Sequence, residues 1–112
     1  MTPCSIGDQV RDFLFVEDVA SAFVSILESN VEGPVNIGSG EVITIKNLVS
    51  KICEKTGRQG LVKFGDLPTP PGDPGELVAD VTILAKKVGW VPKYNLDAGI
   101  EKTVRWWENN LA

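Results

Sequence analysis

The chain has 112 residues, of which 43% are hydrophobic and 23% are charged, proportions typical of one soluble globular domain or part of one. Its net charge of -4 argues against a nucleic-acid partner or an anionic membrane surface, because both favour a basic face. No apolar run approaches the roughly 20 residues of a membrane span, and no basic leader with an apolar core opens the chain, so we expect a cytoplasmic protein.

Histidine is absent, and the two cysteines are Cys4 and Cys53. Without histidine there can be no Ser-His or Cys-His catalytic pair, and two separated cysteines do not predict a zinc site. Cys53 falls on the apolar face of a predicted helix. We therefore expect it to be a small buried hydrophobic residue in a reducing compartment.

The first third of the chain predicts a buried strand followed by a helix. Residues 1–10 have no periodicity and should form a loop or an edge, whereas DFLFV at 12–16 is a short apolar run typical of a strand. A helix is expected over 17–29. Glu17 and Asp18 lie at its start, where negative charge suits the helix dipole. Its buried stripe should comprise Val19, Ala22, Phe23, Ile26 and Leu27.

A second strand and helix follow a turn at 30–34. PVNIG at 34–38 predicts the strand, and Thr44 is a good N-cap for a helix over 45–56. Gly57 is placed to end that helix in the left-handed conformation. The same apolar spacing recurs in this helix, at Ile45, Leu48, Val49, Ile52 and Cys53.

The remainder of the chain contains a proline-rich loop flanked by short strands. LVKFG at 61–65 alternates as a strand does, and LVAD at 77–80 predicts another brief strand. Between them, residues 66–76 carry four of the seven prolines and should form an extended loop, which in compact domains is often functional.

Two helices should complete the fold. Asp80 can cap a short helix that runs through Val88 and stops at Gly89. The last helix is expected over 96–110, with one face lined by Leu96, Gly99, Ile100, Thr103, Val104 and Trp107. The order of elements predicts an α/β fold with a small mixed, mostly parallel sheet and about four helices.

Local motifs point to little chemistry. GSG at 38–40 follows a predicted strand and precedes a helix, but Ile43 stands where a dinucleotide-binding pattern needs its third glycine, so a tight turn is favoured over a phosphate site. Tyr94 has no lysine four residues later to lower its pKa. Arg11 either forms an ion pair with Asp12 or another acid, or binds a phosphate in the bidentate way that suits arginine.

Several segments taken together resemble a known family. They are RDFLFVEDVASAF, then NIGSG, then AD followed by GW, and finally GIEKTVRWW. In this order they are similar to the C-terminal part of the extended short-chain dehydrogenase/reductases, the NAD-dependent nucleotide-sugar epimerases and dehydratases. The resemblance covers about residues 7–110. It implies a single substrate-binding C-terminal region, residues 1–112, of a Rossmann-type enzyme.

In this family an N-terminal domain binds NAD or NADP and carries the catalytic tyrosine and lysine. None of those motifs occurs in this sequence, so the resemblance implies no catalytic residue, cofactor or metal in this chain. It implies instead a nucleoside-diphosphate sugar as the partner. An epimerase or dehydratase is expected for the whole enzyme, with a 4-reductase as the alternative. A different class of function, a non-catalytic binding or interaction module, also stays open.

The resemblance assigns two substrate-binding residues. Arg11 matches the family arginine that contacts the diphosphate, and Asp73 matches an acidic position that touches the ribose in some members. Pro70 stands where those members have a second phosphate-binding arginine, so the diphosphate site should hold one cation fewer. Asn36 matches an asparagine that is more often structural. In the family the strand around Val35–Ile37 can join the Rossmann sheet, so its exposed edge here predicts self-association or a homodimer.

Overall fold

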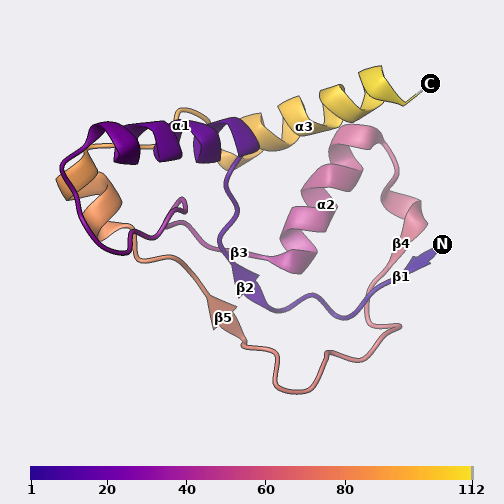
Figure 1. Ribbon diagram of the computed structural model, residues 1–112. Helices are drawn as coiled ribbons and strands as arrows, with labels where there is room; N and C mark the ends of the chain where they lie inside the picture. Colours follow the sequence, from indigo (N-terminus) through magenta and orange to yellow (C-terminus); the bar gives the residue numbers. More distant parts are fainter. Residues whose placement is uncertain (112) are drawn as a thin grey trace.

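The computed structural model describes residues 1–111, in which short strands are interspersed with helices (Figure 1). The strands are β1 (Thr2–Pro3), β2 (Val10–Arg11), β3 (Ile43–Thr44), β4 (Val62–Lys63) and β5 (Glu76–Leu77). The helices are α1 (Val16–Glu28), α2 (Ile45–Thr56), the 3₁₀ turn η1 (Gln59–Leu61), the π-helical segment η2 (Leu84–Val88) and α3 (Leu96–Asn110).

The strands form two small sheets. In one, β1 pairs in parallel with β4. In the other, β2 is central, antiparallel to β3 and parallel to β5, so that Arg11 lies opposite Ile43 on one side and Leu77 on the other. This small mixed sheet with helices around it confirms the predicted α/β class.

The helix boundaries agree closely with the sequence. Thr44 caps α2 as predicted, because its Oγ1 accepts a hydrogen bond of 3.1 Å from the Asn47 N–H. Gly57 ends the same helix with φ 69°, the left-handed value that favours glycine. α1 and α3 also form where their periodicity placed them, within a residue of the expected ends.

The predicted strands are less accurate. No strand forms at 12–16, because pairing stops at Arg11 and α1 already begins at Val16. No strand forms at 34–38 either. There the side chain of Asn36 donates to the Asp80 carbonyl oxygen at 3.3 Å, and Gly38 lies against Ala79. This stretch therefore runs beside 79–80 through side-chain contacts, without a backbone ladder to another described strand.

The other two strands form in part. Only Val62 and Lys63 of 61–65 pair, with β1, and β5 begins one residue before the expected 77–80 strand and ends at Leu77. The long loop over 66–76 is confirmed up to the start of β5 at Glu76. After Asp80 the chain enters a helical turn that ends at Gly89, with φ 77°, as the sequence predicts.

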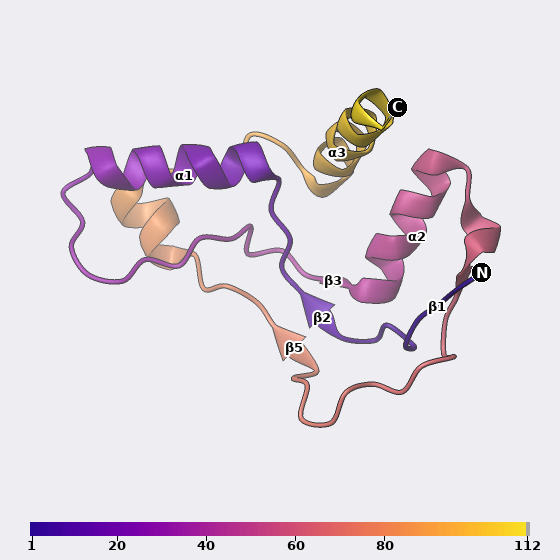
Figure 2. The same ribbon diagram turned by 45° about the vertical axis from the view of Figure 1, so that its right-hand side comes forward.

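The hydrophobic core lies between α1 and η2, which are side by side in both ribbon views (Figures 1 and 2). Its buried members are Ala22, Leu84 and Trp90, surrounded by the half-buried Leu14, Ile26, Val35, Ile37, Val81 and Val88. The Trp90 indole N–H donates to Ser21 Oγ at 2.7 Å, which gives this buried ring the polar partner it needs.

The predicted helix stripes are only partly buried. Phe23 and Leu27 of α1 are 57% and 84% exposed, so their inclusion in the buried face was wrong. Trp107 of α3 is likewise 53% exposed. The molecule is thin, 49 × 38 × 19 Å, and its radius of gyration of 16.3 Å exceeds the roughly 13 Å of a compact domain of this length. It contains too few layers to cover both faces of every helix.

Asp18 connects α1 to the segment before α3. It is 2% exposed, and its carboxylate oxygens accept hydrogen bonds from the backbone N–H groups of Lys93 and Tyr94, at 3.0 and 3.1 Å. The Tyr94 ring stacks edge-on against Phe15. The helix-start interpretation of Asp18 was therefore incomplete, since the side chain also holds a distant segment in place.

Candidate functional site

Arg11 and Asp73, the two residues that the sequence singles out, lie together. Arg11 Nη2 is 2.9 Å from Asp73 Oδ1, and the two side chains are 19% and 29% exposed. Arg11 Nη1 also donates to the Val10 carbonyl oxygen at 2.9 Å. The ion pair that the sequence predicts for Arg11, with Asp12 or another acid, therefore forms with Asp73. Their roles as substrate ligands stay predictions.

Asp73 reaches Arg11 from the proline-rich loop. A turn positions it, since the Asp73 N–H donates to the Pro70 carbonyl oxygen at 3.2 Å. The end of the loop is held against β2 by a hydrogen bond of 2.8 Å from the Val10 N–H to the Gly75 carbonyl oxygen. The sheet and the ion pair together therefore place the loop beside Arg11.

Sequence reasoning missed Gln9, the third member of this cluster. Its Nε2 donates to Asp73 Oδ2 at 2.9 Å, so both oxygens of the Asp73 carboxylate have a partner. Gln9 is 7% exposed. A lone glutamine in an aperiodic segment carries no pattern, and only its position two residues before Arg11 could have suggested it.

The turn at 38–40 serves Asp12 and not a phosphate. The Asp12 carboxylate accepts hydrogen bonds from the Ser39 N–H at 2.9 Å, the Ser39 hydroxyl at 2.6 Å and the Gly40 N–H at 2.8 Å. The backbone amides that a phosphate would use are already paired with a carboxylate. The residues of this turn consequently do not fit a dinucleotide phosphate, and the tight-turn interpretation is the one that the geometry supports.

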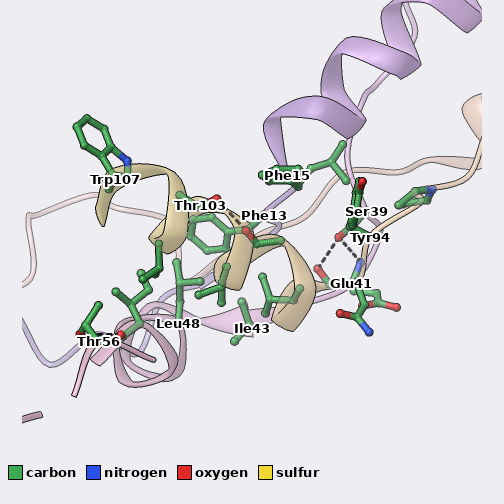
Figure 3. A pocket seen from close by; sticks show the side chains of 18 of the residues that line it. Phe13, Phe15, Ser39, Glu41, Ile43, Leu48, Thr56, Tyr94, Thr103 and Trp107 are labelled. Atoms are coloured by element: carbon green, nitrogen blue, oxygen red, sulfur yellow. Dashed lines mark hydrogen bonds between the residues drawn. The ribbon is translucent and has the colours of Figure 1, made fainter. Parts of the chain in front are cut away.

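A separate cleft of about 1100 Å³ opens between α2, α3 and the extended segments 13–15 and 39–43 (Figure 3). Figure 3 shows Phe13, Leu48 and Trp107 among its mostly apolar lining. Neither Arg11 nor Asp73 lines it. The sequence could not predict this cleft, because its walls come from segments far apart in the chain that only the tertiary structure brings together.

Tyr94 also borders the cleft, and its ring faces are occupied. The ammonium groups of Lys102 and Lys93 lie 5.0 and 5.6 Å from the ring centroid, and Phe15 contacts it with 5.2 Å between centroids. These cation–π and aromatic contacts give Tyr94 a packing role. No group of three or more potential metal ligands occurs within residues 1–111.

The two carboxylates with a shifted pKa lie away from the cluster of Arg11, Asp73 and Gln9. Lys51 of α2 and Asp97 of α3 form an ion pair of 2.8 Å, which lowers the pKa of Asp97 and raises that of Lys51. The Thr82 hydroxyl and backbone N–H lower the pKa of Asp80 by hydrogen bonding to its carboxylate. Both carboxylates therefore help to hold helices.

In the part of the chain that the structure describes, no helix has the length and apolar character needed to cross a membrane.

Known proteins of similar sequence are enzymes of nucleotide-sugar metabolism. The chain is 38% identical over 108 residues to GDP-L-fucose synthase 1 of Arabidopsis thaliana, a match that covers 95% of this chain and 32% of that protein. It is 30% identical over 111 residues to UDP-glucuronic acid decarboxylase 1 of Danio rerio, covering 99% and 26%. The chain thus spans about a third or less of the length of these relatives.

A solved structure has the same fold. UDP-glucose 4-epimerase of Thermotoga maritima, crystallised with UDP-glucose, superposes with a TM-score of 0.87 at 30% identity, over 98% of this chain and 36% of the epimerase. The family model described as GDP-mannose 4,6 dehydratase matches residues 3–103. The chain therefore belongs to the GDP-mannose 4,6-dehydratase family, within the extended short-chain dehydrogenase/reductases.

Proposed function

We propose that residues 1–112 are the nucleoside-diphosphate-sugar-binding part of an NAD(P)-dependent epimerase or dehydratase, with a 4-reductase as the alternative within the class. One observation carries the proposal. The Arg11 guanidinium and the Asp73 carboxylate, which the family pattern assigns to the same ligand, are joined at 2.9 Å beside β2, the central strand of the β3-β2-β5 sheet. A cation for phosphate and an acceptor for hydroxyl groups thus lie side by side.

Arg11 has the donors that a diphosphate requires. A guanidinium carries five N–H groups, and within residues 1–111 its hydrogen bonds are those from Nη1 to Val10 and from Nη2 to Asp73. The remaining N–H groups can bind a phosphate oxygen while Asp73 keeps the guanidinium oriented. Because Pro70 contributes no charge, affinity should depend on this single cation.

Catalysis would belong to residues outside this chain. NAD or NADP, bound by another domain, would supply the hydride chemistry at the sugar. The chain itself has no Tyr-x-x-x-Lys pattern, and the amides of the 38–40 turn are paired with Asp12. Its own contribution is to hold the nucleotide so that the sugar is oriented for reaction, a contribution of proximity and not of chemistry.

An NMR titration of the chain with UDP-, GDP-, CDP- and dTDP-sugars tests the proposal. We expect at least one of them to shift the resonances of Arg11 and of residues 66–76. An Arg11→Gln variant should weaken that binding about tenfold or more, because a charge-assisted hydrogen bond is lost. Arg105→Gln is the matched control, since Arg105 pairs with Glu101 on the exposed face of α3. If no sugar nucleotide perturbs these residues, the proposal is wrong for this chain.

The second candidate is a non-catalytic interaction module that associates with a second copy of itself. The observation that favours it is the apolar cleft, bordered by Val42, Trp107 and Leu111, which are 58%, 53% and 67% exposed. The unpaired segment around Val35–Ile37 adds an available backbone edge. Both features would be covered in a dimer.

Sedimentation equilibrium over a range of concentrations distinguishes this candidate. A self-associating chain shows a mass that rises with concentration, and Trp107→Ser should weaken the association. Trp106→Ser is the control, because Trp106 is similarly exposed, at 56%, but does not line the cleft. A concentration-independent monomer mass would exclude the dimer.

A further inference from the structure

Gln9 has an amide orientation that its neighbour determines. The Asp73 carboxylate only accepts hydrogen bonds, so the group 2.9 Å from Oδ2 must be the Gln9 NH₂ and not its carbonyl oxygen. Oε1 therefore points to the other side of the amide. The residue is 93% buried, and the side chain has little freedom to turn.

Gln9 Oε1 is the one buried side-chain nitrogen or oxygen atom within residues 1–111 that lacks a hydrogen-bond partner. Buried acceptors in native proteins are nearly always paired, so an orphan atom of this kind calls for an explanation. It lies on the residue that holds Asp73, beside the cation that is proposed to bind phosphate. Because Oε1 lies at this site, we look for its missing partner in the ligand that the site would bind.

The missing partner must be a hydrogen-bond donor. A sugar-linked diphosphate is ionised at neutral pH and only accepts, so Oε1 cannot bind the phosphates that suit Arg11. Asp73 is also an acceptor. Two acceptors beside one phosphate-binding cation match a nucleoside diphosphate, in which the ribose hydroxyls lie next to the phosphates and can donate one hydrogen bond each.

We propose that Gln9 is a specificity-determining residue of this site, whose Oε1 accepts a hydrogen bond from a ribose hydroxyl of the bound nucleotide. In the unliganded chain its Nε2 holds the Asp73 carboxylate in the same site. This inference rests on the proposed function above. It adds a residue that no sequence motif indicated, and it assigns to Gln9 the discrimination between ribose and deoxyribose.

Access to Oε1 requires the neighbouring loop to move, because the atom has no exposed surface. Residues 65–77 are exposed, and the stretch 66–75 between β4 and β5 has no helix or strand. Backbone hydrogen bonds attach its two ends to the rest of the chain, from the Leu67 N–H to the Cys4 carbonyl oxygen and from the Val10 N–H to the Gly75 carbonyl oxygen. The contacts that must loosen are the hydrogen bonds of the Asp73 carboxylate with Gln9 and Arg11. When a phosphate oxygen also binds the Arg11 guanidinium, the hydrogen bond from Arg11 to Asp73 weakens. The loop can then move away, and the ribose can occupy the space beside Oε1.

Isothermal titration of the chain with UDP and GDP, with their 2′-deoxy and 3′-deoxy forms, and with pyrophosphate tests the inference. The unaltered chain should prefer the ribonucleotide to at least one deoxy form by about 3- to 10-fold, the value of one hydrogen bond. In Gln9→Met that preference should fall to about one. Pyrophosphate affinity should stay within about twofold, since Arg11 is intact. A residue with a merely structural role would weaken all probes equally.

A second measurement needs no variant and so does not depend on whether Gln9→Met folds. The side-chain carbonyl ¹³C resonance of Gln9 in the unaltered chain should move on addition of UDP or GDP and not on addition of pyrophosphate. If the ribonucleotides bind but this resonance is still, or if Gln9→Met retains the preference, then Oε1 binds only a structural water and the inference is overturned while the proposed function stands. If the unaltered chain binds no nucleotide, both are overturned.

Discussion

Arg11 and Asp73, 62 positions apart in the sequence, form an ion pair in which Nη2 and Oδ1 are 2.9 Å apart. Because one residue belongs to β2 and the other to the loop after β4, the pair attaches that loop to the sheet. The side chains are less than a third exposed, so water screens the interaction less than it would at a fully exposed site.

Asp73→Asn should loosen the loop. Removing the charge weakens the contact with Arg11 by up to about 1 kcal/mol, which corresponds to about a fivefold larger population of the open loop. Hydrogen exchange of the Val10 and Asp73 amides, both bonded to loop carbonyls, measures this change. Asp66→Asn is the control, since its carboxylate pairs with Lys63 in the same region. Equal exchange rates in the two variants would show that the ion pair does not restrain the loop.

Asp18→Ala should destabilise the fold by about 2–4 kcal/mol. The change leaves the backbone N–H groups of Lys93 and Tyr94 without their acceptor, and each hydrogen bond to a charged group contributes about 1.5–3 kcal/mol. Urea denaturation followed by tryptophan fluorescence gives the difference. Glu17→Ala, at the neighbouring exposed position of the same helix turn, should cost less than about 1 kcal/mol. Similar losses in both variants would mean that only the helix dipole matters.

Gly38→Ala should also be destabilising, by about 1–3 kcal/mol. A Cβ at this position would lie 2.6 Å from the Ala79 Cβ and 2.9 Å from Asp12 Oδ2, so the turn that Asp12 holds would have to shift. Gly60→Ala provides a matched control, because a Cβ there meets nothing within 4 Å. Thermal denaturation of the two variants compares them directly. If Gly38→Ala leaves the melting temperature unchanged, the segments around Gly38 and Ala79 can separate at little cost.

Acid should weaken the contacts of Asp80 and Asp97. Both carboxyl groups have a pKa below their ordinary 3.8 in the folded chain, so the stability that they contribute is complete above that value and is lost as the pH falls through the lowered folded pKa values. Added salt should reduce the stability that the Lys51–Asp97 ion pair contributes, because the pair is exposed.

Urea denaturation of the chain and of an Asp80→Asn/Asp97→Asn variant, from about pH 6 to about pH 3, checks this expectation. The variant should lose less stability over that interval, since it has two fewer carboxylates to protonate. Asp66→Asn removes a loop carboxylate that contacts neither Lys51 nor Thr82, and it should leave the pH dependence of the unfolding free energy close to that of the parent. If the free energy of unfolding falls equally with pH in all three proteins, Asp80 and Asp97 do not cause the loss of stability in acid.

Local chemistry explains why helices were predicted well and strands poorly. The caps of α2, Thr44 and Gly57, act within a few residues of their own position, and the apolar spacing of each helix is written along one segment. A two-residue strand such as β2 depends on what lies beside it. DFLFV has strand composition, yet pairing ends at Arg11, because the Asp12 carboxylate binds the distant 39–40 backbone and the chain turns into α1.

The candidate site also contains residues that the sequence could predict and features that only the tertiary structure reveals. Arg11 and Asp73 were named from sequence because their types and surroundings match a family pattern, but nothing in the sequence paired them with each other. Gln9 and the cleft between α2 and α3 escaped prediction, since a polar side chain two residues before Arg11 and an apolar helix face have no distinct pattern. Phe23 was expected inside and is 57% exposed, because the face of a helix that becomes buried depends on which layers pack against it.

By itself, the sequence determined the α/β class, the helices with their ends, the proline-rich loop and the family, because these depend on interactions within a few residues or on motifs in a fixed order. Only the tertiary structure decided that Arg11 pairs with Asp73, that Asp12 fills the glycine turn, and that Gln9 is buried with an unpaired oxygen. Such contacts join residues 27 to 64 positions apart. Their existence depends on how the chain returns on itself, which hydrogen-bonding capacity alone does not specify.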